Sequence, residues 1–213
     1  MTVFGSPAQF AQLFPDDFLE DIIGRVPVAW NRIPKPVSEF LETRITKLLR
    51  HQYAYDPVIK QLPFQVRREL PIDDPLTGEE LGRIDLCLLH GNSEATYFAF
   101  ECKRLNVTFP AGNFAPLTGK YVGSEGMDCF VSGQYSMGHR FGGMIGYVFD
   151  GDIAGIQRSI ETLIQSKTTD LAMSTSDFRP CSFLPNDASI RETVHTLTTQ
   201  QITLFHIFLS MRV

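Results

Sequence analysis

Two long apolar runs that lie close together in the chain constrain the fold more than any other feature. They are IDLCLL (residues 84–89) and TYFAFEC (residues 96–102), separated by the polar segment HGNSEA. Short, almost continuous apolar runs bounded by turn residues are typical of strands that are buried on both faces. Such strands need helices to cover the sheet, so we expect a layered fold of helices and strands.

Helical and strand patterns alternate along the rest of the chain. Apolar residues at helical spacing predict helices at residues 14–24, 37–53, 124–135 and 152–167. Ser38 is a candidate N-cap of the second helix. Strand patterns are found at residues 64–72, 82–89, 96–105, 141–151, 189–197 and 201–211, and residues 106–121 are expected to form an irregular connector. This order predicts a mixed α/β fold of the α+β type, with a central mixed sheet flanked by helices.

The first 36 residues differ in pattern from the rest. FPDDFLEDIIG predicts a short amphipathic helix, and RVPVAWNRIPKP follows it with three prolines. Because proline lacks a backbone N–H and clashes with the preceding helical turn, we expect an extended arm that packs on the core through Trp30. We therefore divide the chain into residues 1–36 and a main domain at residues 37–213, with its core at about 37–150 and a C-terminal helix and strands at 151–213.

The charge balance limits the partners. The chain has 24 acidic and 19 basic residues and a net charge of −5, so its overall field does not attract nucleic acid. Binding nucleic acid would need a local basic patch, a metal ion or a partner subunit. The four cysteines lack C-x-x-C spacing, which disfavours a zinc site, and free thiols indicate a reducing cytoplasm. Neither a secretion signal nor a membrane span is expected from the apolar pattern.

Both apolar runs contain charged residues that a buried strand normally excludes. Because side chains alternate between the faces of a strand, Glu101 and Lys103 point to one side and Cys102 to the other. If the two strands pair, Asp85 lies beside Glu101. Adjacent carboxylates repel each other unless a cation such as Mg²⁺ joins them, and the lysine is then placed to orient or deprotonate a metal-bound water. The alternative is an exposed strand face with an ordinary Glu–Lys pair.

The spacing of these residues resembles a known family. Asp85, with Glu-Cys-Lys at residues 101–103 on the next strand, resembles the PD-(D/E)XK nuclease superfamily, which has the restriction-endonuclease-like fold. The resemblance covers about residues 36–150, and Ile84 stands where the motif is named for proline. It implies that Asp85 and Glu101 bind Mg²⁺ or Mn²⁺ and that Lys103 positions or activates water for phosphodiester hydrolysis.

Two more residues are candidates for the same site. Members of this family often carry an acid on the first core helix, and Glu42 lies at the border of the apolar stripe, whereas Glu39 lies on the solvent face. We therefore expect Glu42 to be a further metal ligand, with a solvated helix-edge acid as the alternative. Gln134 falls in the apolar stripe of the helix expected at residues 124–135. It is a candidate for supporting the active site, or else a hydrogen-bonded core amide.

The resemblance implies a metal-dependent endonuclease that cleaves DNA in preference to RNA in a bacterial restriction or anti-phage defence system. A homodimer or a protein partner is expected to supply specificity, and the location is expected to be cytoplasmic. A non-catalytic docking subunit of a nucleic-acid-processing assembly is an alternative, as is an enzyme acting on nucleotides or other phosphate esters. Among the five histidines, His195 and His206 are expected to pack in the structure or to face solvent.

Overall fold

The computed structural model describes residues 14–36, 39–74, 76–91, 96–135, 139–198 and 200–212. Its helices are η1 (Asp16–Phe18), α2 (Leu19–Trp30), α3 (Glu42–Ala54), η2 (Ile59–Gln61), α4 (Thr118–Val122), α5 (Met127–Val131) and α6 (Ile153–Ser166). Its strands are β1 (Phe64–Asp73), β2 (Glu80–His90), β3 (Tyr97–Leu105), β4 (Val107–Thr108), β5 (Phe114–Ala115), β6 (Phe141–Val148), β7 (Arg179–Pro180), β8 (Ile190–Thr196) and β9 (Gln201–Ser210). Ser38, the candidate N-cap, lies outside the described residues. No helix within the described ranges is long and apolar enough to cross a membrane.

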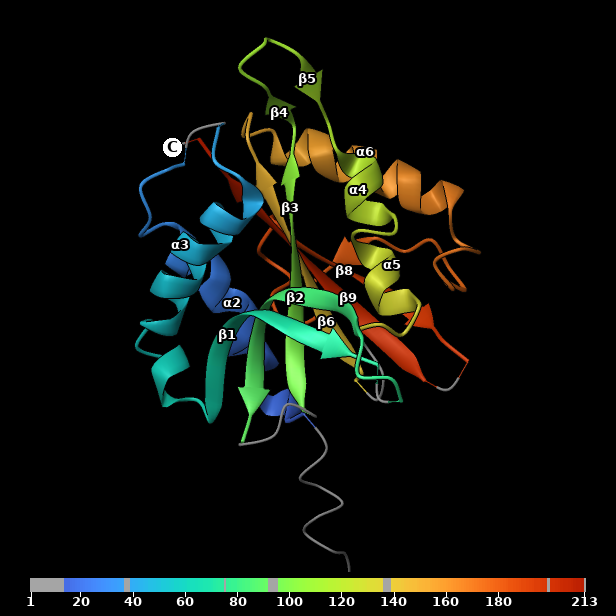
Figure 1. Ribbon diagram of the computed structural model, residues 1–213. Helices are drawn as coiled ribbons and strands as arrows, with labels where there is room; N and C mark the ends of the chain where they lie inside the picture. The colour runs from blue at the N-terminus through green and yellow to red at the C-terminus, as the bar shows by residue number, and fades with distance from the viewer. Residues whose placement is uncertain are drawn as a thin grey trace, which may run out of the picture.

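One mixed sheet organises the molecule. Its strand order is β1-β2-β3-β6-β9-β8-β7. β3 pairs with β6 and β6 with β9 in parallel, and the other neighbours in this sheet are antiparallel. Figure 1 shows α2 and α3 on one side of the sheet and α4, α5 and α6 on the other. The predicted fold class, a central mixed sheet flanked by helices, is confirmed.

Apolar residues fill both interfaces between the sheet and its helices. Trp30 and Ile45 belong to the core under α2 and α3, together with Phe98 and Phe100 of β3. On the other face, α6 buries Ile156, Ile160 and Ile164, which recur every four residues and so form one stripe. Asp152 caps this helix by accepting a hydrogen bond from the N–H of Gly155 at 2.8 Å. The two apolar runs of the sequence became buried strands because helices cover both faces of the sheet.

The expectation of an extended arm at residues 25–36 was wrong for its first half. α2 continues through Pro27 to Trp30. Proline removes one helical hydrogen bond, but Val26, Ala29 and Trp30 are buried in the core, and this burial outweighs the lost bond. Trp30 is the anchor that the sequence predicted: its indole N–H donates to the Ser210 carbonyl at 2.7 Å, and its ring stacks on Tyr147.

Three other boundaries also differ from the expectation. α3 begins at Glu42, so Leu41 precedes the helix and is 65% exposed. The connector at residues 106–121 contains the β4–β5 hairpin and α4. The helix expected at residues 124–135 is reduced to α5, which ends before Gly133, whose φ of 89° is left-handed. Gln134 therefore does not lie on a helical stripe.

A chain of buried hydrogen bonds joins β8 and β9 to α4 and to the loop after α6. His195 Nδ1 lies 2.7 Å from the Leu171 carbonyl oxygen, which can only accept, so this nitrogen carries the hydrogen. His195 Nε2 then accepts from the hydroxyl of Thr193 at 2.7 Å, and that hydroxyl oxygen accepts from His206 Nε2 at 2.9 Å. His206 Nδ1 accepts from Tyr121 at 3.1 Å. Every member is satisfied only when both imidazoles are neutral.

Acid is therefore expected to destabilise this protein through His206. Burial lowers the pKa of His206 to about 3, and burial also lowers the pKa of His195. As the pH falls below about 6.5, the unfolded chain binds a proton at His206 that the native state does not bind, so the free energy of unfolding drops by about 1.4 kcal/mol per pH unit from this histidine, and His195 adds to the loss in the same direction. Urea unfolding from pH 7.5 to pH 4.5 measures this slope. His206→Gln should have a shallower slope, and equal slopes for the two proteins would contradict the expectation.

Candidate functional site

The candidate site lies where β2 separates from β3. The two strands pair from Leu89↔Tyr97 to Leu86↔Phe100, and Asp85 is the next residue of β2. Beyond this point β2 continues beside β1, whereas β3 continues beside β6. In Figure 1 the turn end of the β1–β2 hairpin bends out of line with the sheet and crosses in front of β3. The divergence leaves one edge of β3 without a strand partner.

At this edge of β3, two carboxylates accept the backbone hydrogen bonds that a neighbouring strand would otherwise accept. Asp85 Oδ2 accepts a hydrogen bond from the backbone N–H of Cys102 at 2.8 Å. Two residues further along β3, Glu42 Oε2 accepts from the backbone N–H of Arg104 at 3.0 Å. An unpaired buried N–H is costly, so these bonds hold the acids of β2 and α3 at fixed positions along β3.

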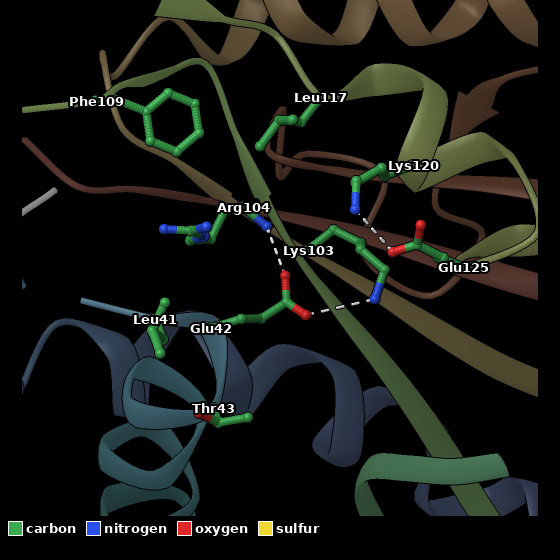
Figure 2. A pocket seen from close by; sticks show the side chains of 9 residues that line it. All are labelled: Leu41, Glu42, Thr43, Lys103, Arg104, Phe109, Leu117, Lys120 and Glu125. Atoms are coloured by element: carbon green, nitrogen blue, oxygen red, sulfur yellow. Dashed lines mark hydrogen bonds and ion pairs between the residues drawn. The ribbon is translucent and has the colours of Figure 1, made fainter. Parts of the chain in front are cut away.

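Lys103 lies at the centre of this arrangement. Its Nζ lies 2.5 Å from Glu101 Oε1, 3.0 Å from the Cys102 carbonyl oxygen and 3.4 Å from Glu42 Oε1. An ammonium group has three hydrogens to donate, and these contacts use all three. Lys103 and Glu101 are 7% and 6% exposed, so the pair is almost entirely removed from water. Figure 2 shows Glu42 between Lys103 and the backbone of Arg104.

The site contains more negative than positive charge. Three carboxylates, those of Glu42, Asp85 and Glu101, act on the single ammonium of Lys103. The pKa of Glu101 is raised to about 8, first by burial and then by the charge of Asp85, against the opposing effect of Lys103. The second oxygen of Glu101, Oε2, is buried without a hydrogen-bond partner among the described residues. A buried carboxylate oxygen without a partner is stabilised when a proton or a cation binds to it.

The pKa values of Glu42, Asp85 and Lys103 are shifted as well. Burial raises the pKa of Glu42 and of Asp85, although Lys103 lowers both. Burial by itself would lower the pKa of Lys103, but the three surrounding carboxylates outweigh it and raise that pKa above its usual range. The lysine therefore stays protonated while it is surrounded by these acids.

A cavity of about 340 Å³ opens beside the acids. Glu42, Lys103 and Arg104 line one part of it, and Phe109, Lys120 and Glu125 line another (Figure 2). Lys120 and Glu125 form an ion pair at 3.0 Å in which both side chains are more than half exposed. The cavity thus combines basic groups suited to an anion with a direct approach to Lys103.

The structure brings four of the five predicted site residues together. Asp85, Glu101, Lys103 and Glu42 converge from β2, β3 and α3, as their hydrogen bonds show. Gln134 does not join them in any contact recorded among the described residues. Its Nε2 donates to the Leu81 carbonyl oxygen at 2.8 Å, so the amide links the loop after α5 to the start of β2.

Sequence reasoning missed one acid near the site. The β1–β2 register pairs Arg68 with Leu86 and Leu70 with Ile84, which leaves Glu69 opposite Asp85. Glu69 has a left-handed backbone, with φ at 54°, which is uncommon for a residue with a side chain. After burial, which is the largest influence, the charge of Glu69 is among those that raise the pKa of Asp85. The register shifts by one residue between Ile72 and Asp73, so counting back from the β1–β2 turn would not have placed these two acids opposite each other.

Metal ligation is not preformed in this arrangement. No group of three His, Cys, Asp or Glu side chains within the described ranges is arranged to hold a metal ion. Both oxygens of Glu42 are hydrogen-bonded, so in this geometry Glu42 anchors Lys103 and the edge of β3. Asp85 and Glu101 are the stronger candidates for metal ligands, because Glu101 keeps a free oxygen beside Asp85.

No protein-family model, curated protein or solved structure matches this chain. The function is therefore inferred from the geometry and electrostatics of these residues.

Replacing Lys103 tests the charge balance of the site. Lys103→Met is expected to lower the free energy of unfolding by about 3 kcal/mol, because it leaves buried carboxylates without their cation. The double variant Lys103→Met with Glu101→Gln should recover most of that loss. Lys120→Met, which breaks an exposed ion pair, should change stability by less than about 1 kcal/mol. Denaturant unfolding at neutral pH measures the free energy of unfolding of all three variants. Equal losses for Lys103→Met and Lys120→Met would contradict the inferred charge balance of the site.

Proposed function

We propose that this protein is a metal-dependent nuclease that hydrolyses DNA phosphodiester bonds with a site of the PD-(D/E)XK type. One observation carries the proposal: Glu42, Asp85 and Glu101 converge from three separate elements around the buried ammonium of Lys103. A purely structural ion pair needs one acid for one lysine. A surplus of carboxylates, here one buried (Glu101) and two half-buried (Glu42 and Asp85), is typical of sites that bind a further cation.

The residues of the site fit a hard divalent metal such as Mg²⁺ or Mn²⁺. The available donors are carboxylate oxygens, which these ions prefer. The Oε2 atom of Glu101 has no hydrogen-bond partner among the described residues, and the pKa of that carboxyl is raised to about 8. Both observations indicate that a bound cation would stabilise the ionised form of Glu101. Asp85 and Glu101 would hold the ion, with Glu42 as a further acid. When bound, such an ion lowers the pKa of water and polarises a phosphate oxygen.

The residues of this chain would contribute position and charge. The bonds to the N–H groups of Cys102 and Arg104 hold Asp85 and Glu42 in place before any substrate arrives. Lys103 reaches the cavity with a protonated amine, which suits stabilisation of the negative charge that develops on a phosphate during hydrolysis. Arg104 and Lys120 also line the cavity and would bind the phosphate backbone.

A restriction or anti-phage defence system is the setting we propose for this activity, by analogy with other nucleases of this kind. The net charge of −5 makes unassisted attraction to DNA weak. We therefore propose that a second copy of the chain or a partner protein supplies specificity. DNA is proposed in preference to RNA as the substrate.

A second candidate function is a non-catalytic docking subunit in a nucleic-acid-processing assembly. The 2.5 Å ion pair between Lys103 and Glu101 favours it, because the lysine already neutralises one acid without a metal. The two candidates differ in what the remaining carboxylates do. A nuclease needs Asp85 to hold an ion, whereas a docking module does not.

The first test is cleavage of plasmid and single-stranded DNA in the presence of Mg²⁺ or Mn²⁺. The native protein is expected to cleave, and EDTA should abolish the reaction. Glu101→Gln and Lys103→Ala should each lower the rate at least a hundredfold, because the first removes a metal ligand and the second removes the ammonium that stabilises the charge developing on the phosphate. Arg158→Ala, an exposed residue of α6 outside the cavity lining, is the matched control and should retain most of the rate. Full activity in Glu101→Gln would contradict the assignment.

Metal binding separates the two candidates even if the isolated chain does not cleave. Calorimetric titration with Mn²⁺ should give saturable binding to the native protein and at least tenfold weaker binding to Asp85→Asn. Asp128→Asn, a change of equal charge on α5, should bind as the native protein does. Equal binding by all three, or no binding by the native protein, would favour the docking module.

A further inference from the structure

A second cavity, larger than the one beside the acids, lies between α3 and β1. These two elements pack side by side at the edge of the molecule in Figure 1. The groove has a volume of about 660 Å³. Four basic side chains line it, those of Lys47, Arg50, Arg67 and Arg68, and its described lining contains no acid. In a chain with a net charge of −5, this is a concentrated patch of the opposite sign.

The positive charges of this groove, which we call the α3–β1 groove, are largely uncompensated. Lys47, Arg50 and Arg67 form no salt bridge with any acid in the described parts of the chain, and Arg68 pairs with Glu69. Arg50 donates to the Val66 carbonyl at 3.0 Å, which fixes its guanidinium between α3 and β1. Arg67 is oriented by a 2.9 Å bond to the side chain of Gln65. Like charges held close together without acids are stabilised by an anionic ligand.

The α3–β1 groove is aligned with the candidate active site. Thr43 lines the cavity beside Lys103, while Lys47 and Arg50 line the groove. These residues are separated by four and three positions, so they share one face of α3. The rise of a helix places Thr43 and Arg50 about 10 Å apart along the axis. Measured along the duplex axis, that length spans about three nucleotides of one strand, at a rise of about 3.4 Å each.

We propose that the α3–β1 groove binds the phosphate backbone of duplex DNA and delivers one strand to the cavity beside Lys103. This inference rests on the proposed function and names the form of its substrate. Arginine and lysine recognise phosphates, whereas single strands are usually held by stacking on aromatic rings. The described lining of the groove contains no Phe, Tyr or Trp. A duplex backbone therefore matches the groove better than an unpaired strand.

The test measures binding of a fluorescently labelled duplex oligonucleotide by anisotropy in EDTA, where no cleavage occurs. Lys47→Glu combined with Arg67→Glu should weaken binding at least tenfold. The dependence of log Kd on log salt concentration should also become shallower by about two, one for each lost phosphate contact. Lys47 and Arg67 are exposed, so both substitutions leave the core intact, and circular dichroism checks the fold. Arg50 is not substituted, because its guanidinium donates to the Val66 carbonyl and so links α3 to β1.

The matched control is Arg158→Glu combined with Arg212→Glu, which changes the net charge equally at exposed positions outside the groove. This variant should bind within about twofold of the native protein. Equal weakening in both double variants would show a general charge effect and would overturn the proposal. So would unchanged binding in the groove variant, absence of duplex binding by the native protein, or a larger loss for a single-stranded oligonucleotide than for the duplex.

The same proteins separate this inference from the proposed function. If the native protein cleaves DNA and the groove variant cleaves with an unchanged KM, the groove proposal fails and the nuclease stands. If the native protein neither cleaves DNA nor binds Mn²⁺ but the groove variant alone loses duplex binding, the groove stands as a duplex-binding surface and the nuclease fails.

Discussion

The buried ammonium of Lys103 is the interaction on which the rest of the site depends. It joins an acid of its own strand, Glu101, to an acid of α3, Glu42, and it also binds the backbone carbonyl of Cys102. Without this charge, the carboxylates brought together by α3, β2 and β3 would repel one another in a poorly hydrated environment. The lysine therefore makes the convergence of these elements possible, and the remaining excess of negative charge is the feature on which the proposed metal binding depends.

The sheet supports this site through the other face of β3. Cys102 points away from the acids and is buried in the core beneath α2 and α3, with Thr46 and Tyr147 hydrogen-bonded to each other there at 3.0 Å. On β6, Gly143 pairs with Phe100, and a Cβ atom at that glycine would lie 2.3 Å from the phenylalanine ring. Because Gly143 has no side chain, the ring of Phe100 can pack against it. A rigid central strand holds the acids at fixed positions, which a catalytic or a docking role would require.

Much of this arrangement was predictable because it depends on local pattern. Alternation along one strand places Glu101 and Lys103 on the same side, and the helical period places Glu42 near the edge of a buried stripe. The predictions that failed depend on contacts between distant segments. α2 continues through Pro27 because its residues are buried by the sheet, and Gln134 leaves the helix because Gly133 turns the chain. Glu69 was missed because its position opposite Asp85 depends on the register of a hairpin.

The amino-acid sequence by itself determined which strands are buried, which charged residues interrupt them and which class of fold results. Those properties follow from the order of polar and apolar residues along the chain, which acts over a few positions. The tertiary structure decided where β2 leaves β3, and so which backbone N–H groups Asp85 and Glu42 bind. It also decided that basic residues of α3 and β1 line one groove. Both results depend on register and packing between elements far apart in sequence, which no local pattern encodes.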